Sequence, residues 1–227
     1  MLDLFSGAGF AESVRHFAIV FIPAFLGIIL HEVGHGWAAL KMGDPTAKLA
    51  GRITLNPLPH IDPMGLLCFV LTSLSGAFVF GWAKPVPVNM RHFRDPKKGM
   101  LLCSLAGPGT NVVLAFLFAG LLKLFLVLDP GVVYSASPTE VFLASTLSAG
   151  VSINLCLAIL NMLPVPPLDG SKVLAYFLPA RAAFSYLSWQ RWGFLVLLVL
   201  IVAGLLDKIL VPLLQGSYKL VLSLFGI

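Results

Sequence analysis

Residues 17–40 read FAIVFIPAFLGIILHEVGHGWAAL, an apolar run that ends in two histidines and a glutamate within five positions. A membrane-spanning helix needs about 20 consecutive, mostly apolar residues, and this run has that length. Charged groups within a span cost roughly 2.5–3.5 kcal/mol each and are generally retained for a function. The run therefore predicts a transmembrane helix with a reactive site near its C-terminal end.

The composition of the chain also indicates an integral membrane protein. Of 227 residues, 58% are hydrophobic and 11% are charged, with mean hydropathy +0.94. A soluble domain carries about 25% charged residues, so these charges could not cover a water-exposed surface. No Lys/Arg run with interleaved aromatic residues lies in a polar setting, so nucleic acid is not an expected partner. Cys68, Cys103 and Cys156 are far apart and form no metal or redox motif.

The hydropathy pattern predicts an all-α polytopic membrane protein with about five to six transmembrane helices. We expect a single integral-membrane domain over residues 1–227, with its core at 17–170 and C-terminal helices at 171–227. Between the first span and the 100–128 span we expect a small membrane-associated β or re-entrant element, because 47–56 and 84–90 resemble strands. The candidate spans are 17–40, 64–82, 100–128, 140–163, 192–206 and 209–225.

Segment 64–82 decides the topology, because it is short and contains several glycine and serine residues. If it dips into the membrane and returns, the ends of spans 17–40 and 140–163 face the same side. The connections on that side then carry 11 of the 15 basic residues, as the positive-inside rule expects for the cytoplasm. We therefore expect five crossings, a re-entrant or hairpin element, an external N-terminus and a reactive site on the cytoplasmic side.

Residues 31–35 have the pattern H-E-x-x-H. Positions i and i+4 of a helix lie on one face, so His31 and His35 can both bind one tetrahedral zinc ion. Glu32 can accept a proton from a zinc-bound water, whose pKa falls to about 7. The pattern predicts a zinc site with Glu32 as general base. The alternative is a polar helix end that the membrane interface solvates.

A catalytic zinc ion takes three protein ligands and a water, so one more ligand must come from elsewhere. The metzincin continuation of the motif fails, because Ala38 and Lys41 occupy its glycine and histidine positions. Of the other glutamates, Glu12 and Glu140, the second falls on the wrong face in the expected topology. The remaining candidates are Asp44, His60, Asp62, His92, Asp95, Asp129 and Asp169.

Asp169 is distinguished by its setting in NMLPVPPLDG, residues 161–170, directly after an apolar span. The three prolines cannot continue a helix, and Gly170 permits a tight turn after the carboxylate. Such an unwound segment can present a side chain into a cavity at membrane depth. The residues alone leave a second interpretation open, in which Asp169 is a solvated loop residue after the end of a helix.

The pair HEVGHGWAAL and NMLPVPPLDG resembles the site-2 protease family of intramembrane zinc metalloproteases. AGPGTN at 106–111 and GRITLNPLPHIDPMG at 51–65 are also similar to compact prokaryotic members. The resemblance implies one Zn²⁺ held by His31, His35 and Asp169, with Glu32 as general base. It covers most of residues 31–170, and we expect no PDZ or CBS domain and no span before the first.

Three polar residues are secondary candidates for binding the substrate or assisting at the oxyanion. Asn161 could bond a substrate or end its own helix, and Asn111 could bind a substrate strand or join two spans. His60 could approach the site from the re-entrant region or lie in a surface loop. For all three the residues leave the choice open.

The resemblance implies a zinc metalloendopeptidase that cleaves peptide bonds in or near transmembrane segments, as in regulated intramembrane proteolysis. The expected partners are a transmembrane or membrane-associated protein substrate, which could add to a strand-like edge, and the lipid bilayer. The expected location is the plasma membrane of a prokaryote. The alternatives are a membrane zinc-binding or transport protein without hydrolysis, and a hydrolase of lipids or small amides. The chain offers no indication of oligomeric state.

Overall fold

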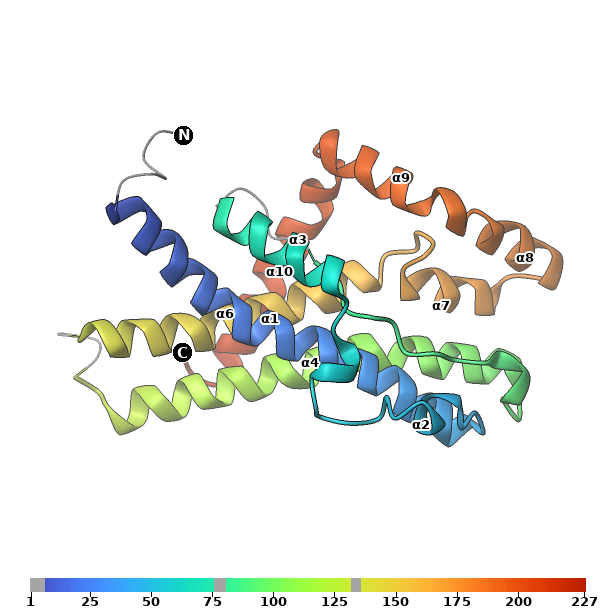
Figure 1. Ribbon diagram of the computed structural model, residues 1–227, viewed down its shortest axis with the longest axis horizontal. Helices are drawn as coiled ribbons and strands as arrows, with labels where there is room; N and C mark the ends of the chain where they lie inside the picture. Colours follow the sequence, from blue (N-terminus) through green and yellow to red (C-terminus); the bar gives the residue numbers. More distant parts are fainter. Residues whose placement is uncertain (1–6, 76–80, 132–135) are drawn as a thin grey trace.

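The computed structural model describes residues 7–75, 81–131 and 136–227 of the chain (Figure 1). Within these ranges the secondary structure is helical and contains no β-strand, which confirms the predicted all-α class. The helices are α1 (Gly7–Met42), α2 (Thr46–Leu49), η2 (Leu58–His60), α3 (Pro63–Ser75), η3 (Met90–His92), α4 (Pro96–Leu128), α6 (Pro138–Asn161), α7 (Asp169–Phe177), α8 (Ala180–Ser188), α9 (Gln190–Val202) and α10 (Leu205–Leu224).

Helices α1, α4 and α6 pack against one another and form the centre of the molecule (Figure 1). Small buried residues, Ala115 and Ala119 on α4 and Val151 on α6, allow the helices to approach closely. Val221 of α10 closes the same cluster from a third side. This arrangement brings the C-terminal half of α1 and the first half of α4 into contact, where His31 and His35 lie.

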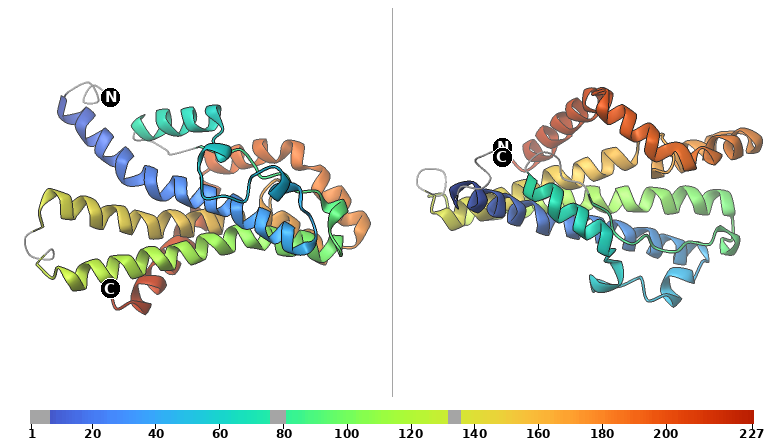
Figure 2. Two further views of the ribbon diagram at one scale, coloured as in Figure 1. Left: turned by 60° about the horizontal axis from the view of Figure 1, so that its bottom comes forward. Right: turned by 45° about the horizontal axis from the view of Figure 1, so that its top comes forward.

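The described part of the chain has three helices long and apolar enough to cross a membrane: Ala11–Met42, Pro96–Leu128 and Pro138–Asn161. Helices α8 and α9 would form a fourth such segment if this pair, bent by 42°, counts as one span. The second view in Figure 2 shows the two helices running along the outside of the central three. The polytopic membrane architecture is therefore confirmed, whereas the predicted number of five to six spans is not.

After His60 the chain forms helix α3 and then comes back to His60 at Lys84. Helix α3 packs against α1, where the Phe69 ring lies 5.8 Å from that of Phe21. A Cβ on Gly65, near the start of α3, would collide with the backbone carbonyl of Trp82. The amide of Lys84 donates to His60 O at 2.8 Å, so the two ends of the excursion meet.

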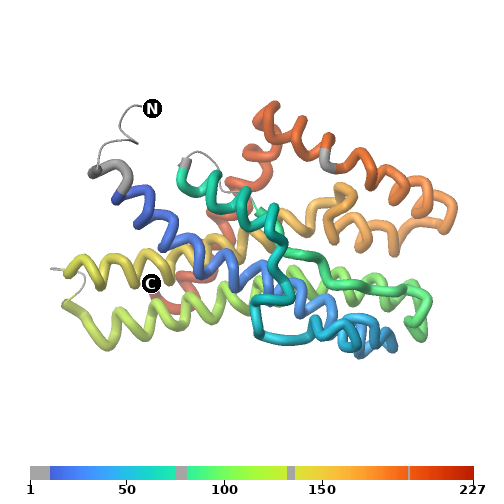
Figure 3. Tube along the Cα trace, viewed as in Figure 1, coloured from blue at the N-terminus to red at the C-terminus, as the bar shows by residue number. Residues whose placement is uncertain are grey.

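The predicted β element is not found among the described residues, and the reason lies in its hydrogen bonds. Residues 47–49 belong to helix α2, and turns follow them. In 84–90 the backbone runs beside the C-terminal half of α1 (Figure 3). Pro85 and Pro87 have no N–H, and the amides of Lys84 and Val86 donate to His60 O and to the Glu32 carboxylate. An alternating apolar pattern alone could not supply a neighbouring strand.

A buried carboxylate fastens this segment to the end of α1. Asp44 accepts hydrogen bonds from the Thr46 amide at 3.0 Å, the Asn89 amide at 2.6 Å and the His92 ring at 3.0 Å, and also from the Thr46 hydroxyl. Burial by itself raises the pKa of the Asp44 carboxyl, but these bonds outweigh it and lower the pKa to about 2. Asp44 therefore holds residues 89–92 at the end of α1 as an anion.

Candidate metal centre

His31, His35 and Asp169 meet although Asp169 lies far along the chain from the histidines. The two histidines are one turn apart on α1, as their i, i+4 spacing requires. Their Nε2 atoms are 3.0 Å apart. Asp169 Oδ2 lies 3.3 Å from His31 Nε2 and 3.0 Å from His35 Nε2. Asp169 is the first residue of α7, which packs along α4. A Cβ on Gly170 would strike Met162 O, so glycine permits this turn.

The His31 ring is oriented by a buried chain of amides. The Asn111 amide group donates through Nδ2 to Gly27 O and to Asn154 Oδ1, both at 3.0 Å. Asn111 Oδ1 therefore faces His31 Nδ1, 2.6 Å away, and must accept its proton. Asn154 is fixed in turn by its bond to Gly150 O at 2.9 Å. With its proton on Nδ1, the uncharged form of the His31 ring would present the lone pair of Nε2 toward Asp169.

The His35 ring has the same tautomer for a simpler reason. Its Nδ1 lies 2.7 Å from the carbonyl oxygen of Cys103, and a carbonyl can only accept. The neutral forms of His31 and His35 therefore place two nitrogen lone pairs and a carboxylate oxygen within 3.0–3.3 Å of one another. Three mutually facing acceptors repel unless a proton or a cation lies among them. Two imidazoles and one carboxylate are a typical donor set for Zn²⁺, so the residues fit that ion.

Helix α4 closes the centre from one side through a residue without a side chain. A Cβ on Gly107 would lie 2.5 Å from His35 Nε2 and 2.7 Å from His31 Cε1. These separations are shorter than real Cβ contacts, so only glycine leaves both rings in place. Pro108 within α4 directly follows this residue.

Glu32 lies in the same cleft as the three candidate ligands. The cleft has a volume of about 480 Å³, and its walls come from residues 85–93, the start of α4 and the 161–172 segment. Glu32 Oε2 accepts a hydrogen bond from the Val86 amide at 2.7 Å. One carboxylate oxygen is thereby held, and Oε1 has no hydrogen-bond partner in the part of the chain that the structure describes. Lys172 also lines the cleft, with Nζ 3.1 Å from Asp169 Oδ1.

Residues 17–204 match the model of Peptidase family M50. The chain belongs to peptidase family M50. It is therefore a metalloprotease of the membrane that uses Zn²⁺, and His31, His35 and Asp169 are the group that could hold this ion. The resemblance to site-2 proteases is confirmed.

Relatives from bacteria and an archaeon agree with the M50 assignment, and the name of each contains the words zinc metalloprotease. YwhC of Bacillus subtilis is 36% identical over 205 residues, which are 90% of each chain. Rip2 of Mycolicibacterium smegmatis is 31% identical over 195 residues, 85% of this chain and 70% of the relative. MJ0611 of Methanocaldococcus jannaschii is 34% identical over 165 residues, 72% of this chain and 73% of the relative. No solved structure matches the chain significantly.

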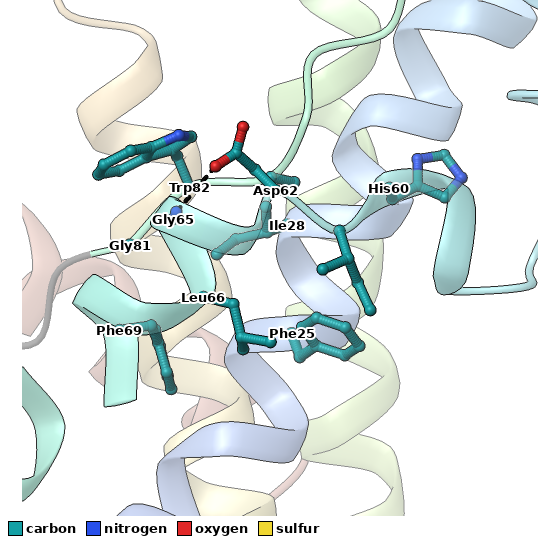
Figure 4. Close-up of a pocket in the computed structure, with 11 residues that line it drawn as sticks. Phe25, Ile28, His60, Asp62, Gly65, Leu66, Phe69, Gly81 and Trp82 are labelled. Carbon is teal, nitrogen blue, oxygen red and sulfur yellow. Dashed lines mark hydrogen bonds between the residues drawn. The ribbon is translucent and has the colours of Figure 1, made fainter. Parts of the chain in front are cut away.

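The three secondary candidates lie in different places in this M50 peptidase. Asn161 lines the cleft, and its amide donates to Leu157 O of its own helix at 2.9 Å. Asn111 is fully buried and contacts His31 instead of the cleft. His60 is also fully buried, but it lies at the rim of a separate cavity of about 30 Å³ between α1 and α3 (Figure 4). Burial lowers the pKa of His60, which keeps its ring neutral.

Four residues of the site were not identified from the sequence. Asn154 carries a detectable signal, since a polar side chain inside an apolar span is costly and generally functional. Gly107 lies within the A-G-P-G-T-N element, but nothing in that element indicates contact with the histidines. No pattern in the sequence marks Lys172 or the amide of Val86 as part of the site. Only the packing shows that Lys172 pairs with Asp169 and that the Val86 amide pairs with Glu32.

Proposed function

We propose that this M50 peptidase hydrolyses peptide bonds in or near transmembrane segments of membrane-protein substrates, with Glu32 as general base. The convergence of His31, His35 and Asp169 in one cleft with a fourth side chain, the Glu32 carboxylate, supports this proposal. When bound, Zn²⁺ supplies a Lewis acid that polarises the scissile carbonyl and acidifies water.

The cleft suits an extended peptide more than a helix. A helix pairs all its backbone groups internally, so a transmembrane substrate must unwind before a peptide bond is accessible. The 85–90 segment forms one wall, and the carbonyl oxygens of Pro85 and Pro87 have no hydrogen-bond partner among the described residues. We propose that these oxygens accept N–H groups of the unwound substrate.

Each polar residue predicted from the sequence, apart from the candidate metal ligands, has a proposed task. Glu32 takes the proton of the attacking water through the oxygen that Val86 leaves open and passes it to the leaving amine. Asn161, which lines the cleft, would assist at the developing oxyanion by turning its amide away from Leu157 O. Asn111 keeps the His31 ring in the tautomer that binds the metal, and His60 supports Lys84 through its carbonyl oxygen.

We further propose that the cleft faces the cytoplasm of a prokaryotic plasma membrane and that the chain is one membrane domain. The basic residues gathered on the connections 41–63, 83–99 and 164–191 support this orientation. The cleft lies between two of these connections, 83–99 and 164–191. A transport protein is less well supported, because the candidate ligands gather at one place instead of along successive spans.

The proposal is tested with Glu32→Gln and Asp169→Ala beside the wild type. Zinc content and cleavage of transmembrane peptides and lipid amides are measured on the purified proteins. Glu32→Gln should keep zinc and lose peptide cleavage, whereas Asp169→Ala should lose zinc. Normal cleavage by Glu32→Gln would remove its assigned role, and turnover of lipid amides alone would refute the substrate class.

A further inference from the structure

The two carboxylate oxygens of Asp169 have different surroundings. Oδ2 faces the Nε2 atoms of His31 and His35, at 3.3 and 3.0 Å. Oδ1 accepts a hydrogen bond from Lys172 Nζ at 3.1 Å. The Asp169 side chain is 7% exposed and that of Lys172 is 41% exposed, so the ammonium reaches inward from the mouth of the cleft.

We propose that Lys172 is a positioning residue that keeps Asp169 Oδ1 away from the metal. The proposal rests on the function proposed above. A carboxylate can coordinate a cation through one oxygen or through both. A catalytic zinc ion needs one position free of protein ligands, and a second oxygen of Asp169 would occupy it. A charge-assisted bond from the ammonium to Oδ1 competes with that second contact.

The simpler interpretation is an i, i+3 ion pair that stabilises the first turn of α7. The chain contains such a pair for comparison at the start of α4. There Lys98 Nζ lies 4.0 Å from Asp95 Oδ2, and both side chains are more than half exposed, at 70% and 51%. The Lys172 pair differs in three respects, since it is shorter, its carboxylate is buried and it lines the cleft. A pair that only stabilised the helix would not need the buried carboxylate.

The test compares Lys172→Met, Lys172→Arg and the matched control Lys98→Met in the full-length protein. Zinc affinity is measured by competition with a chelator, and X-ray absorption counts the oxygen ligands of the bound zinc. Cleavage of a transmembrane peptide gives kcat and KM. We expect Lys172→Met to bind Zn²⁺ at least as tightly as the wild type, with one more oxygen ligand. Its kcat should fall about 10- to 100-fold with KM unchanged.

Lys172→Arg should restore most of kcat, because a guanidinium can still hold Oδ1, and Lys98→Met should match the wild type. Weaker zinc binding by Lys172→Met with unchanged coordination would overturn the proposal and leave a structural ion pair. An unchanged kcat would overturn it too. The zinc measurements do not depend on the substrate, so they can fail or succeed separately from the proposed peptide hydrolysis.

Discussion

Replacing Gly107 by alanine would place a methyl group 2.5 Å from Nε2 and 2.6 Å from Cε1 of His35, and 2.7 Å from Cε1 of His31. Ordinary van der Waals contact begins at 3.4 Å. The rings or α4 must therefore move by about 1 Å, and a displacement of this size at a reacting centre can cost about 100-fold in rate. The crowding itself should cost about 1–3 kcal/mol of stability.

Gly109 provides a matched control on the same helix, because a Cβ there meets nothing within 4 Å. Both substitutions gain the same helix propensity, about 1 kcal/mol, so their difference isolates the contact with the histidines. We expect Gly107→Ala to bind zinc about 10- to 100-fold more weakly and to lose about 100-fold in kcat/KM. Gly109→Ala should keep both values near those of the wild type.

The assay measures zinc affinity by chelator competition and cleavage of a transmembrane peptide, with thermal unfolding as a check on the fold. Wild-type zinc affinity and turnover in Gly107→Ala would refute the placement of α4 against the two rings. Equal losses in both alanine variants would show that the glycines act through the helix and not through the metal centre.

Three further predictions concern the surroundings of the site. Asn111→Leu removes the acceptor that fixes the first histidine ring, so zinc affinity should fall about 10- to 100-fold in chelator competition; unchanged affinity would contradict the tautomer argument. Val86→Pro removes the amide that holds Glu32 and should lower kcat about 10-fold with zinc content and KM unchanged, since hydrogen bonds to charged groups contribute about 1.5–3 kcal/mol. Val88→Pro is its control, because the Val88 amide has no hydrogen bond to any described residue, and similar losses in both variants would argue against the Val86–Glu32 bond. Asp44→Ala should lower the free energy of unfolding at neutral pH by about 1.5–3 kcal/mol, because it removes the charged acceptor of the hydrogen bonds at the end of α1. Because the pKa of Asp44 is lowered to about 2, the stability that its charge contributes is complete above about pH 4 and is lost as the pH falls toward 2. Unfolding measured in detergent should therefore show the difference in unfolding free energy between the wild type and Asp44→Ala becoming smaller in acid. A difference that grows in acid would be inconsistent with a native-state anion.

The chemistry of the centre could be predicted from short stretches of chain. Hydropathy over about 20 residues identified the membrane class, and the i, i+4 spacing placed two imidazoles on one helix face. The prolines before Asp169 indicated a break in the helix where a carboxylate could turn inward. The predicted strands at 47–56 and 84–90 were wrong for the described residues, because alternation does not supply a pairing partner.

The sequence by itself determined the residue types of the metal centre, the helix that carries two of them and the apolar class of the chain. These properties depend on neighbours a few positions apart. Only the tertiary structure decided that Asn111 orients His31, that the Val86 amide holds Glu32 and that Lys172 occupies one oxygen of Asp169. A buried polar group must find a partner within about 3 Å, and the packing of distant segments selects that partner.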